Sequence, residues 1–582
     1  MDLDILDVSI FDGHSVLPAN RISIRDGIIT DIGTGEAAEP AARTISAAGA
    51  LVTPGFVDAH VHTTFGGQES LACDVSGADG LDATLTAIRD YLAADADAAN
   101  AHAADSWVTG GGWSMADFPG GAPRARLLDE LGTQRPIILL SADHHSAWVN
   151  SRAMAIAGLD ASTPTPAGGV IEKDEAGSPA GCLHESAIDI ISAHVPPATD
   201  AAIATGLLAG QSYLHSLGVT AWMDAIVGDY SGHRSPFDAY VGAAESGDLR
   251  AEVVGSLWWP RDVEDIDVQV AELVERRRTE GSFRTTSVKF MLDGIVESRT
   301  AAMSTEYSCA CGGFGTSYFT REHLHRSFEA LDAAGFDIHC HAIGDAAVKA
   351  ALDAFEAIGR GPDDNDQTGS GPRPDARHHI AHVQVVDPVD VPRFKTLGVT
   401  ANLQALWACR DQQMIDLNIP YLGDERTAWL YPFKSFAEAG THLAMGSDWP
   451  VSTADPWQAI HVAVNRTHPD GGDPAPLLPE QAIDLTTALR AYTSGSAHLL
   501  RSSANGAIRI GGVANLALAS TNPFDDDPSG LVDVRTVLTV AGGRIVFDET
   551  GTDCTTGTAA TTGTAAPTSH TKIPATHAER QS

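Results

Sequence analysis

Short apolar segments alternate with amphipathic helical segments across most of the 582-residue chain. Such alternation is typical of a parallel β-sheet, and eight strands is the number that closes a (β/α)8 barrel. The eight strands that we expect cover residues 56–62, 219–224, 251–258, 287–292, 336–341, 379–383, 399–403 and 442–447. We therefore predict an α/β fold built on a TIM-like (β/α)8 barrel.

Strand patterns without a helical period occupy both ends of the chain, at residues 3–53 and again at about 507–547. Neither set is large enough to bury its own core, so we expect residues 1–53 and 500–550 to form one small composite β-sandwich. The barrel would then span residues 54–499, with residues 63–200 as a large insertion after its first strand. The tail, residues 551–582, is rich in Thr, Ala and Gly and is predicted to be disordered.

Charge and composition exclude several classes of partner. The chain has 76 acidic and 37 basic residues, a net charge of −39, so nucleic acid or an anionic membrane surface would be repelled. It has no apolar run long enough for a membrane span, and the start Met1-Asp2-Leu3-Asp4 lacks the basic region of a signal peptide. Its seven scattered cysteines fit a reducing compartment. We expect a cytoplasmic protein that acts on a small molecule, and nothing in the composition fixes the number of subunits of a homo-oligomer.

Polar side chains lie where several of the expected strands end. His60 and His62 are one residue apart, so they project from the same face of the first strand, a geometry suited to holding one metal ion. His341, His382 and Asp448 end three other strands, and the C-terminal ends of barrel strands meet at one mouth. A single histidine among 23 is more often structural, but buried polar groups are costly unless something satisfies them. The joint pattern therefore indicates a metal site.

Lys289 lies among apolar residues in the fourth strand. A lysine with a lowered pKa can react with carbon dioxide to give an anionic carbamate, which would bridge two metal ions. The alternative is an ordinary ammonium group paired with Asp293 or Glu297. His339 shares the face of His341 one layer deeper in the barrel, so we expect it to support the metal ligands rather than bind the metal.

This combination of motifs resembles the amidohydrolase superfamily. The motifs are His60-Val61-His62, Lys289 ahead of Asp293-Gly294, His341 in His-Ala-Ile-Gly-Asp, His382, and Asp448 in Gly-Ser-Asp-Trp-Pro. The Gly-Gly-Gly-Trp turn at residues 110–113, the segment His145 to Ser151, and Arg299-Thr300-Ala301 are similar to the branch of N-substituted formamide deformylase, also called metal-dependent amidohydrolase family 3. The resemblance covers about residues 3–548.

The resemblance implies a centre of two divalent ions, although a single ion would also fit. The nitrogen and oxygen ligands favour zinc, and manganese, iron or cobalt would also fit. His60 and His62 would bind the inner ion with Asp448, His341 and His382 would bind the outer ion, and carbamylated Lys289 would bridge them. A metal-bound hydroxide would cleave a C–N amide bond of an N-formyl or N-acyl amine, with Asp448 as the catalytic proton shuttle.

Substrate contacts and two alternative functions complete these expectations. The candidates for substrate binding are Trp113, His145, Asn150, Asp293, Arg299, Trp407 and Arg426, each with a plain structural alternative. The same metal chemistry would serve a deaminase or an ester hydrolase. A non-catalytic scaffold on the same barrel is a further alternative, which the presence of every expected metal position disfavours.

Overall fold

A computed structural model describes residues 1–550, except residues 36, 38, 40, 98–105, 167, 231–232, 310–311, 359–370 and 472. The tail that we predicted to be disordered, residues 551–582, lies outside the described residues. No helix in the described part of the chain is both long enough and apolar enough to cross a membrane.

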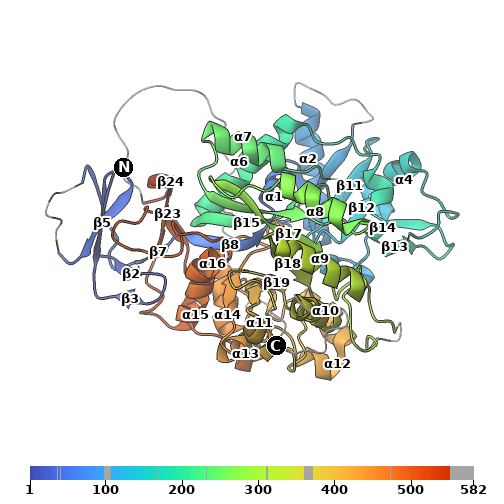
Figure 1. Ribbon diagram of the computed structural model, residues 1–582. Coiled ribbons are helices and arrows are strands. Elements are labelled where there is room, and N and C mark those ends of the chain that lie inside the picture. Colours follow the sequence, from blue (N-terminus) through green and yellow to red (C-terminus); the bar gives the residue numbers. More distant parts are fainter. Residues whose placement is uncertain are drawn as a thin grey trace, which may run out of the picture. The chain divides into compact units, whose positions relative to one another are not determined.

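Eight parallel strands form the central sheet, and they are the eight predicted from the sequence (Figure 1). In spatial order they are β8 (Phe56–Val61), β15 (Val219–Val227), β16 (Glu252–Trp258), β17 (Phe283–Met291), β18 (Asp337–Ala342), β19 (His379–His382), β20 (Thr400–Leu403) and β21 (Leu443–Met445). Just beyond β21, the amide of Asp448 donates to the carbonyl of His60 at 2.7 Å, and the amide of His62 donates to the carbonyl of Trp449 at 2.8 Å. These bonds join the last strand to the first, as in a TIM-like (β/α)8 barrel.

The helices that follow the strands cover the barrel with amphipathic faces (Figure 1). Helix α9 (Arg321–Ala333) is an example, because it buries Leu324, Phe328 and Leu331 at helical spacing against the barrel core. The side chain of Thr320 caps its first turn by accepting from the amide of His323. Strand β18 follows this helix in the chain and places His341 at the mouth of the barrel.

Both ends of the chain contribute to further sheets. One has the order β5 (Ile28–Gly33), β4 (Arg21–Arg25), β1 (Leu3–Leu6) and β6 (Arg43–Ser46), and is made of N-terminal strands alone. The other mixes the two ends, in the order β24 (Arg544–Asp548), β23 (Thr536–Ala541), β22, β7, β2 (Ser9–Phe11) and β3 (Val16–Leu17). Strand β7 (Leu51–Pro54) pairs antiparallel with β22 (Leu516–Ala519). A single buried cluster contains apolar residues from both ends, including Ile5 and Val540. The residue boundaries of a composite β-sandwich domain stay a prediction.

The segment between the first two barrel strands begins with helix α1 (Thr63–Ser70) and then forms a sheet of its own. That sheet has the order β13 (Gly169–Lys173), β14 (Pro179–Glu185), β12, β11, β10 (Val108–Trp113) and β9 (Cys73–Asp74). Its strands β11 (Ile137–Ser141) and β12 (Ser146–Val149) are joined by a turn that carries Asp143, His144 and His145. This turn reaches the mouth of the barrel, where all three residues line the same cavity as the predicted metal ligands.

Candidate metal centre and adjoining cavity

The six predicted metal ligands lie together at the C-terminal ends of the barrel strands. His60 and His62 come from the end of β8, Lys289 from β17, His341 from β18, His382 from β19, and Asp448 from the segment after β21. Each exposes 9% or less of its surface, and all six line one cavity. The six side chains therefore converge as expected, and their roles as metal ligands stay a prediction.

The donor atoms of this cluster are arranged as in a metal site. Asp448 Oδ1 lies 3.1 Å from His60 Nε2 and 3.0 Å from His62 Nε2. One donor atom each from His60, His382 and Asp448 lie within 4.8 Å of one another. Among the described residues, both ring nitrogens of His382 and Oδ1 of Asp448 are buried without a hydrogen bond. Because unsatisfied buried polar atoms are costly, this donor set fits a divalent cation bound by nitrogen and oxygen.

Two of these residues have a strained backbone. His382 has φ 76° and Asp448 has φ 60°, in the left-handed region that non-glycine residues seldom adopt. The surrounding bonds hold them there: the amide of His382 donates to Gln404 Oε1 at 2.6 Å, and that of Asp448 donates to the carbonyl of His60. Strain of this kind concentrates at functional sites, where it directs a side chain to a fixed place.

Burial controls the charge of the cluster. It lowers the pKa of Lys289 to about 7, although Asp448 opposes the shift. It lowers the pKa values of His60 and His382 well below their ordinary range, so these imidazoles are neutral, as metal ligands must be. Burial alone would raise the pKa of Asp448, but the neighbouring histidines outweigh it and hold that pKa well below its usual range.

Lys289 is not paired with Asp293 or Glu297, the pairing that was the alternative to a carbamate. Within the described part of the chain, its amine makes no hydrogen bond or ion pair with Asp293 or Glu297. Glu297 instead accepts from Asn418 Nδ2 at 2.8 Å. Asp293 accepts from the backbone amides of residues 302, 343 and 344 at 2.8–3.1 Å. An amine left without a carboxylate and with a lowered pKa is the form that could react with carbon dioxide.

His339 makes the contact expected of a residue that orients a ligand. Its Nε2 lies 2.8 Å from Nδ1 of His60, and its Nδ1 lies 3.1 Å from Oγ of Ser256. The other nitrogen of His60, Nε2, faces Asp448. A hydrogen bond to the far nitrogen of a ligating histidine fixes its tautomer and its orientation.

Three of the predicted substrate contacts lie beside the metal cluster. His145 and Trp407 line its cavity, and the Trp407 ring stacks on the ring of His382 at 5.3 Å between centroids and 6° between planes. Asp293 Oδ1 lies 3.2 Å from His341 Nδ1, without the alignment of a hydrogen bond. Because Asp293 also binds three backbone amides, it holds the loops around His341 in place.

The structure does not bring the other four candidates to this cavity. The indole of Trp113 donates to a backbone carbonyl at 2.9 Å inside the insertion sheet. The side chain of Asn150 caps helix α4 (Ser151–Ala157) and binds the neighbouring strand. Arg426 is buried and donates to three backbone carbonyls. Arg299 lies over the ring of Tyr421 at 5.4 Å. The polar atoms of Trp113, Asn150 and Arg426 thus form hydrogen bonds that support the fold, and these residues do not line the cavity of the metal cluster.

Sequence reasoning missed the acidic partners of the histidine turn. Glu185, the last residue of β14 (Pro179–Glu185), lies 2.8 Å from Nδ1 of His145. Glu69, on α1, lies 3.1 Å from Nε2 of His144. Burial alone would lower the pKa of His145, but Glu185 outweighs burial and raises it to about 9. Nothing local in the sequence pairs residues 40 and 75 positions apart, so only the folded insertion reveals them.

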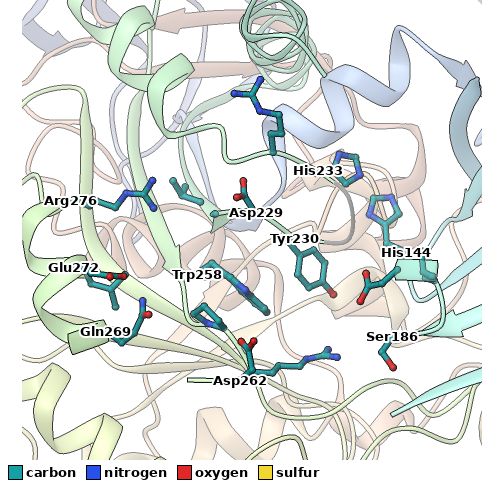
Figure 2. A pocket seen from close by; sticks show the side chains of 18 of the residues that line it. His144, Ser186, Asp229, Tyr230, His233, Trp258, Asp262, Gln269, Glu272 and Arg276 are labelled. Carbon is teal, nitrogen blue, oxygen red and sulfur yellow. The ribbon is translucent and has the colours of Figure 1, made fainter. Parts of the chain in front are cut away.

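A larger cavity of about 950 Å³ adjoins the metal cluster (Figure 2). His144 and Tyr230 line both this cavity and that of the metal cluster, so the two spaces meet at these side chains. Figure 2 shows His144, Tyr230 and His233 at one end of the larger cavity and Gln269, Glu272 and Arg276 at the other. A small molecule at the metal cluster could therefore extend into it.

Comparison with known proteins agrees with this geometry. The model of the amidohydrolase family matches residues 43–547. Protein LONG AFTER FAR-RED 3 of Arabidopsis thaliana is 28% identical over 571 residues, covering 94% of this chain and 91% of its own. N-substituted formamide deformylase of Arthrobacter pascens is 25% identical over 571 residues, covering 92% of this chain and 96% of its own.

A solved structure supports the same fold. The crystal structure of an uncharacterized metal-dependent hydrolase from Pyrococcus horikoshii OT3 superimposes with a TM-score of 0.67 and 22% identity. The match covers 91% of this chain and 98% of that one. With the family match spanning both the barrel and the strand ends that carry the donor cluster, this chain belongs to the amidohydrolase family.

Proposed function

We propose that the protein is a metal-dependent hydrolase that cleaves the C–N amide bond of a small N-formyl or N-acyl amine. The observation that supports this most is the convergence of six buried nitrogen and oxygen donors in one cavity. His60, His62 and Asp448 would hold one ion, His341 and His382 a second, and carbamylated Lys289 would bridge them, with zinc as the expected metal. When bound, the metal supplies an activated water and polarises the substrate carbonyl.

Asp448 is the proton shuttle of this proposal. The histidines around it keep its carboxylate ionised, so it can accept the proton that the attacking water loses. Passing that proton to the departing nitrogen requires contact with both water and substrate. Its position in the cavity wall between His62 and His382 supports such contact.

His145 and Trp407 are the substrate contacts that we retain. His145 is held by Glu185 through Nδ1, and its raised pKa keeps the imidazole protonated near neutral pH. The protonated ring can donate a hydrogen bond to the carbonyl oxygen as negative charge develops on it. Trp407 covers one side of the same cavity with its indole face.

The test is metal analysis of the purified protein followed by a substrate screen. We expect divalent metal in the protein and hydrolysis of formamides or small acylated amines. Hydrolysis of esters without any C–N bond would favour the ester hydrolase. Metal without any hydrolysis would favour the non-catalytic scaffold, and absence of metal from fully folded protein would remove the basis of the proposal.

A further inference from the structure

His144 occupies the junction between the metal cluster and the larger cavity. It lines both spaces, and Figure 2 shows it close to His233. Its backbone has φ 61°, a left-handed conformation that a residue other than glycine adopts at a cost. The tight turn between β11 and β12 thus places this imidazole at the junction of the two cavities.

Glu69 holds the imidazole of His144. Nε2 lies 3.1 Å from both carboxylate oxygens of Glu69, which is buried on helix α1. Among the described residues, Nδ1 of His144 makes no hydrogen bond and is not one of the buried unpaired atoms. The ring is therefore fixed at one nitrogen and open to the cavity at the other, the arrangement of a histidine that exchanges a proton with a ligand.

The charges around His144 favour its protonated form. Burial alone would lower its pKa, but Glu69 outweighs burial, Asp143 and Asp448 act in the same direction, and the pKa is raised. His62 and His233 also face this group, and both have lowered pKa values, so they add little positive charge. The carboxylate of Glu69 thus favours the imidazolium form of His144.

The volumes of the two cavities indicate which part of a substrate each cavity can hold. The space at the metal cluster is about 50 Å³, whereas the adjoining cavity is about 950 Å³. A third cavity of about 200 Å³ also adjoins the metal cluster, at Asp143, Trp407 and Val451, so the cavity of about 950 Å³ beyond His144 has the most room for a bulky amine. An amide with its acyl group at the metal cluster and its amine in that larger cavity would place its C–N bond at the junction, beside His144.

We propose that His144, held by Glu69, donates the proton to the departing nitrogen, and that the substrates are amides with a small acyl group and a bulky amine. This inference rests on the proposed function, and it divides the two proton transfers assigned there to Asp448. Asp448 accepts the proton of the attacking water and holds it while the C–N bond breaks. As the C–N bond breaks, its electron pair goes to nitrogen, which takes the proton from Nδ1. Exchange with water in the open cavity then returns both residues to their starting states.

The test is a series of formanilides that differ only in a ring substituent. The departure of 4-nitroaniline depends less on proton donation than that of 4-methoxyaniline, because the nitro group withdraws charge from the nitrogen. In His144→Asn, whose new side chain tolerates a positive φ, we expect kcat for 4-methoxyformanilide to fall about 100-fold or more and kcat for 4-nitroformanilide to fall less than about tenfold. Metal content should stay at the wild-type value. Equal losses for both substrates would overturn the proposal, because a merely structural role slows them alike.

Two further variants and one control support the interpretation. Glu69→Gln should also lower kcat more for 4-methoxyformanilide than for 4-nitroformanilide, with a smaller difference than in His144→Asn. His144→Gly, also compatible with the left-handed backbone, should be rescued by added imidazole with 4-methoxyformanilide, and failure of this rescue would count against proton donation. Glu172→Gln is the matched control, since Glu172 pairs with His184 at 3.3 Å in the same insertion and outside both cavities. If wild-type protein hydrolyses no amide at all, the proposed function fails and this inference falls with it.

Discussion

The pair of His145 and Glu185 predicts how stability depends on pH. Glu185 raises the pKa of His145 from its ordinary 6.5 to about 9 against the effect of burial. Because the folded pKa is the higher one, the stabilisation is fully present below the unfolded pKa and is lost as the pH rises through about 9. A rise from 6.5 to about 9 corresponds to about 3 kcal/mol. Glu185 itself, with a pKa of about 2, stays ionised throughout this range.

The perturbation is Glu185→Gln, and the assay is urea unfolding of wild type and variant at about pH 6 and about pH 9. Between these two conditions the wild type should lose about 3 kcal/mol more of its unfolding free energy than the variant does. Comparing the two proteins cancels the other groups that titrate in this range. Glu172→Gln again serves as the control, and it should retain the wild-type pH dependence. If wild type and Glu185→Gln lost the same unfolding free energy between these two pH values, His145 and Glu185 would not form a charged, buried pair.

Three other substitutions separate the roles of the site residues. Asp448→Asn should retain bound metal in elemental analysis but lose about 100-fold or more in kcat, and near-normal turnover would contradict its role as proton shuttle. His339→Ala should weaken metal affinity about 10- to 100-fold in a chelator competition, because His60 loses the partner of its Nδ1, whereas unchanged affinity would leave His339 a packing residue. Asn150→Ala should cost about 1 kcal/mol of stability through loss of the α4 cap while leaving KM unchanged, and a raised KM would return Asn150 to the substrate site.

The barrel and the donor cluster could be predicted because their signals are local. An apolar run of fixed length predicts a strand, and a polar residue where the run ends predicts a side chain at the mouth. His382 and Asp448 illustrate this, since His382 is the last residue of β19, Asp448 lies three residues beyond β21, and both lie in the cluster. No knowledge of the loops was needed.

The insertion could not be predicted in this way. Glu185 and Glu69 reach the cavity only because a separate sheet and helix α1 place them there. Trp113 and Asn150 belong to the motifs that resemble the family, but their polar atoms bind the backbone of the insertion itself. A motif can thus shape the support of a site without contacting a substrate, and only tertiary contacts distinguish the two roles.

We propose that six side chains at the mouth of the barrel hold a metal centre bridged by Lys289, and anomalous diffraction from crystals of the protein purified with its metal can test this. We expect two peaks in the cavity, one beside His60, His62 and Asp448 and one beside His341 and His382, with carbamate density on Lys289 between them. A single peak with an unmodified Lys289 would contradict the bridged centre, and no peak in this cavity would contradict the metal site itself.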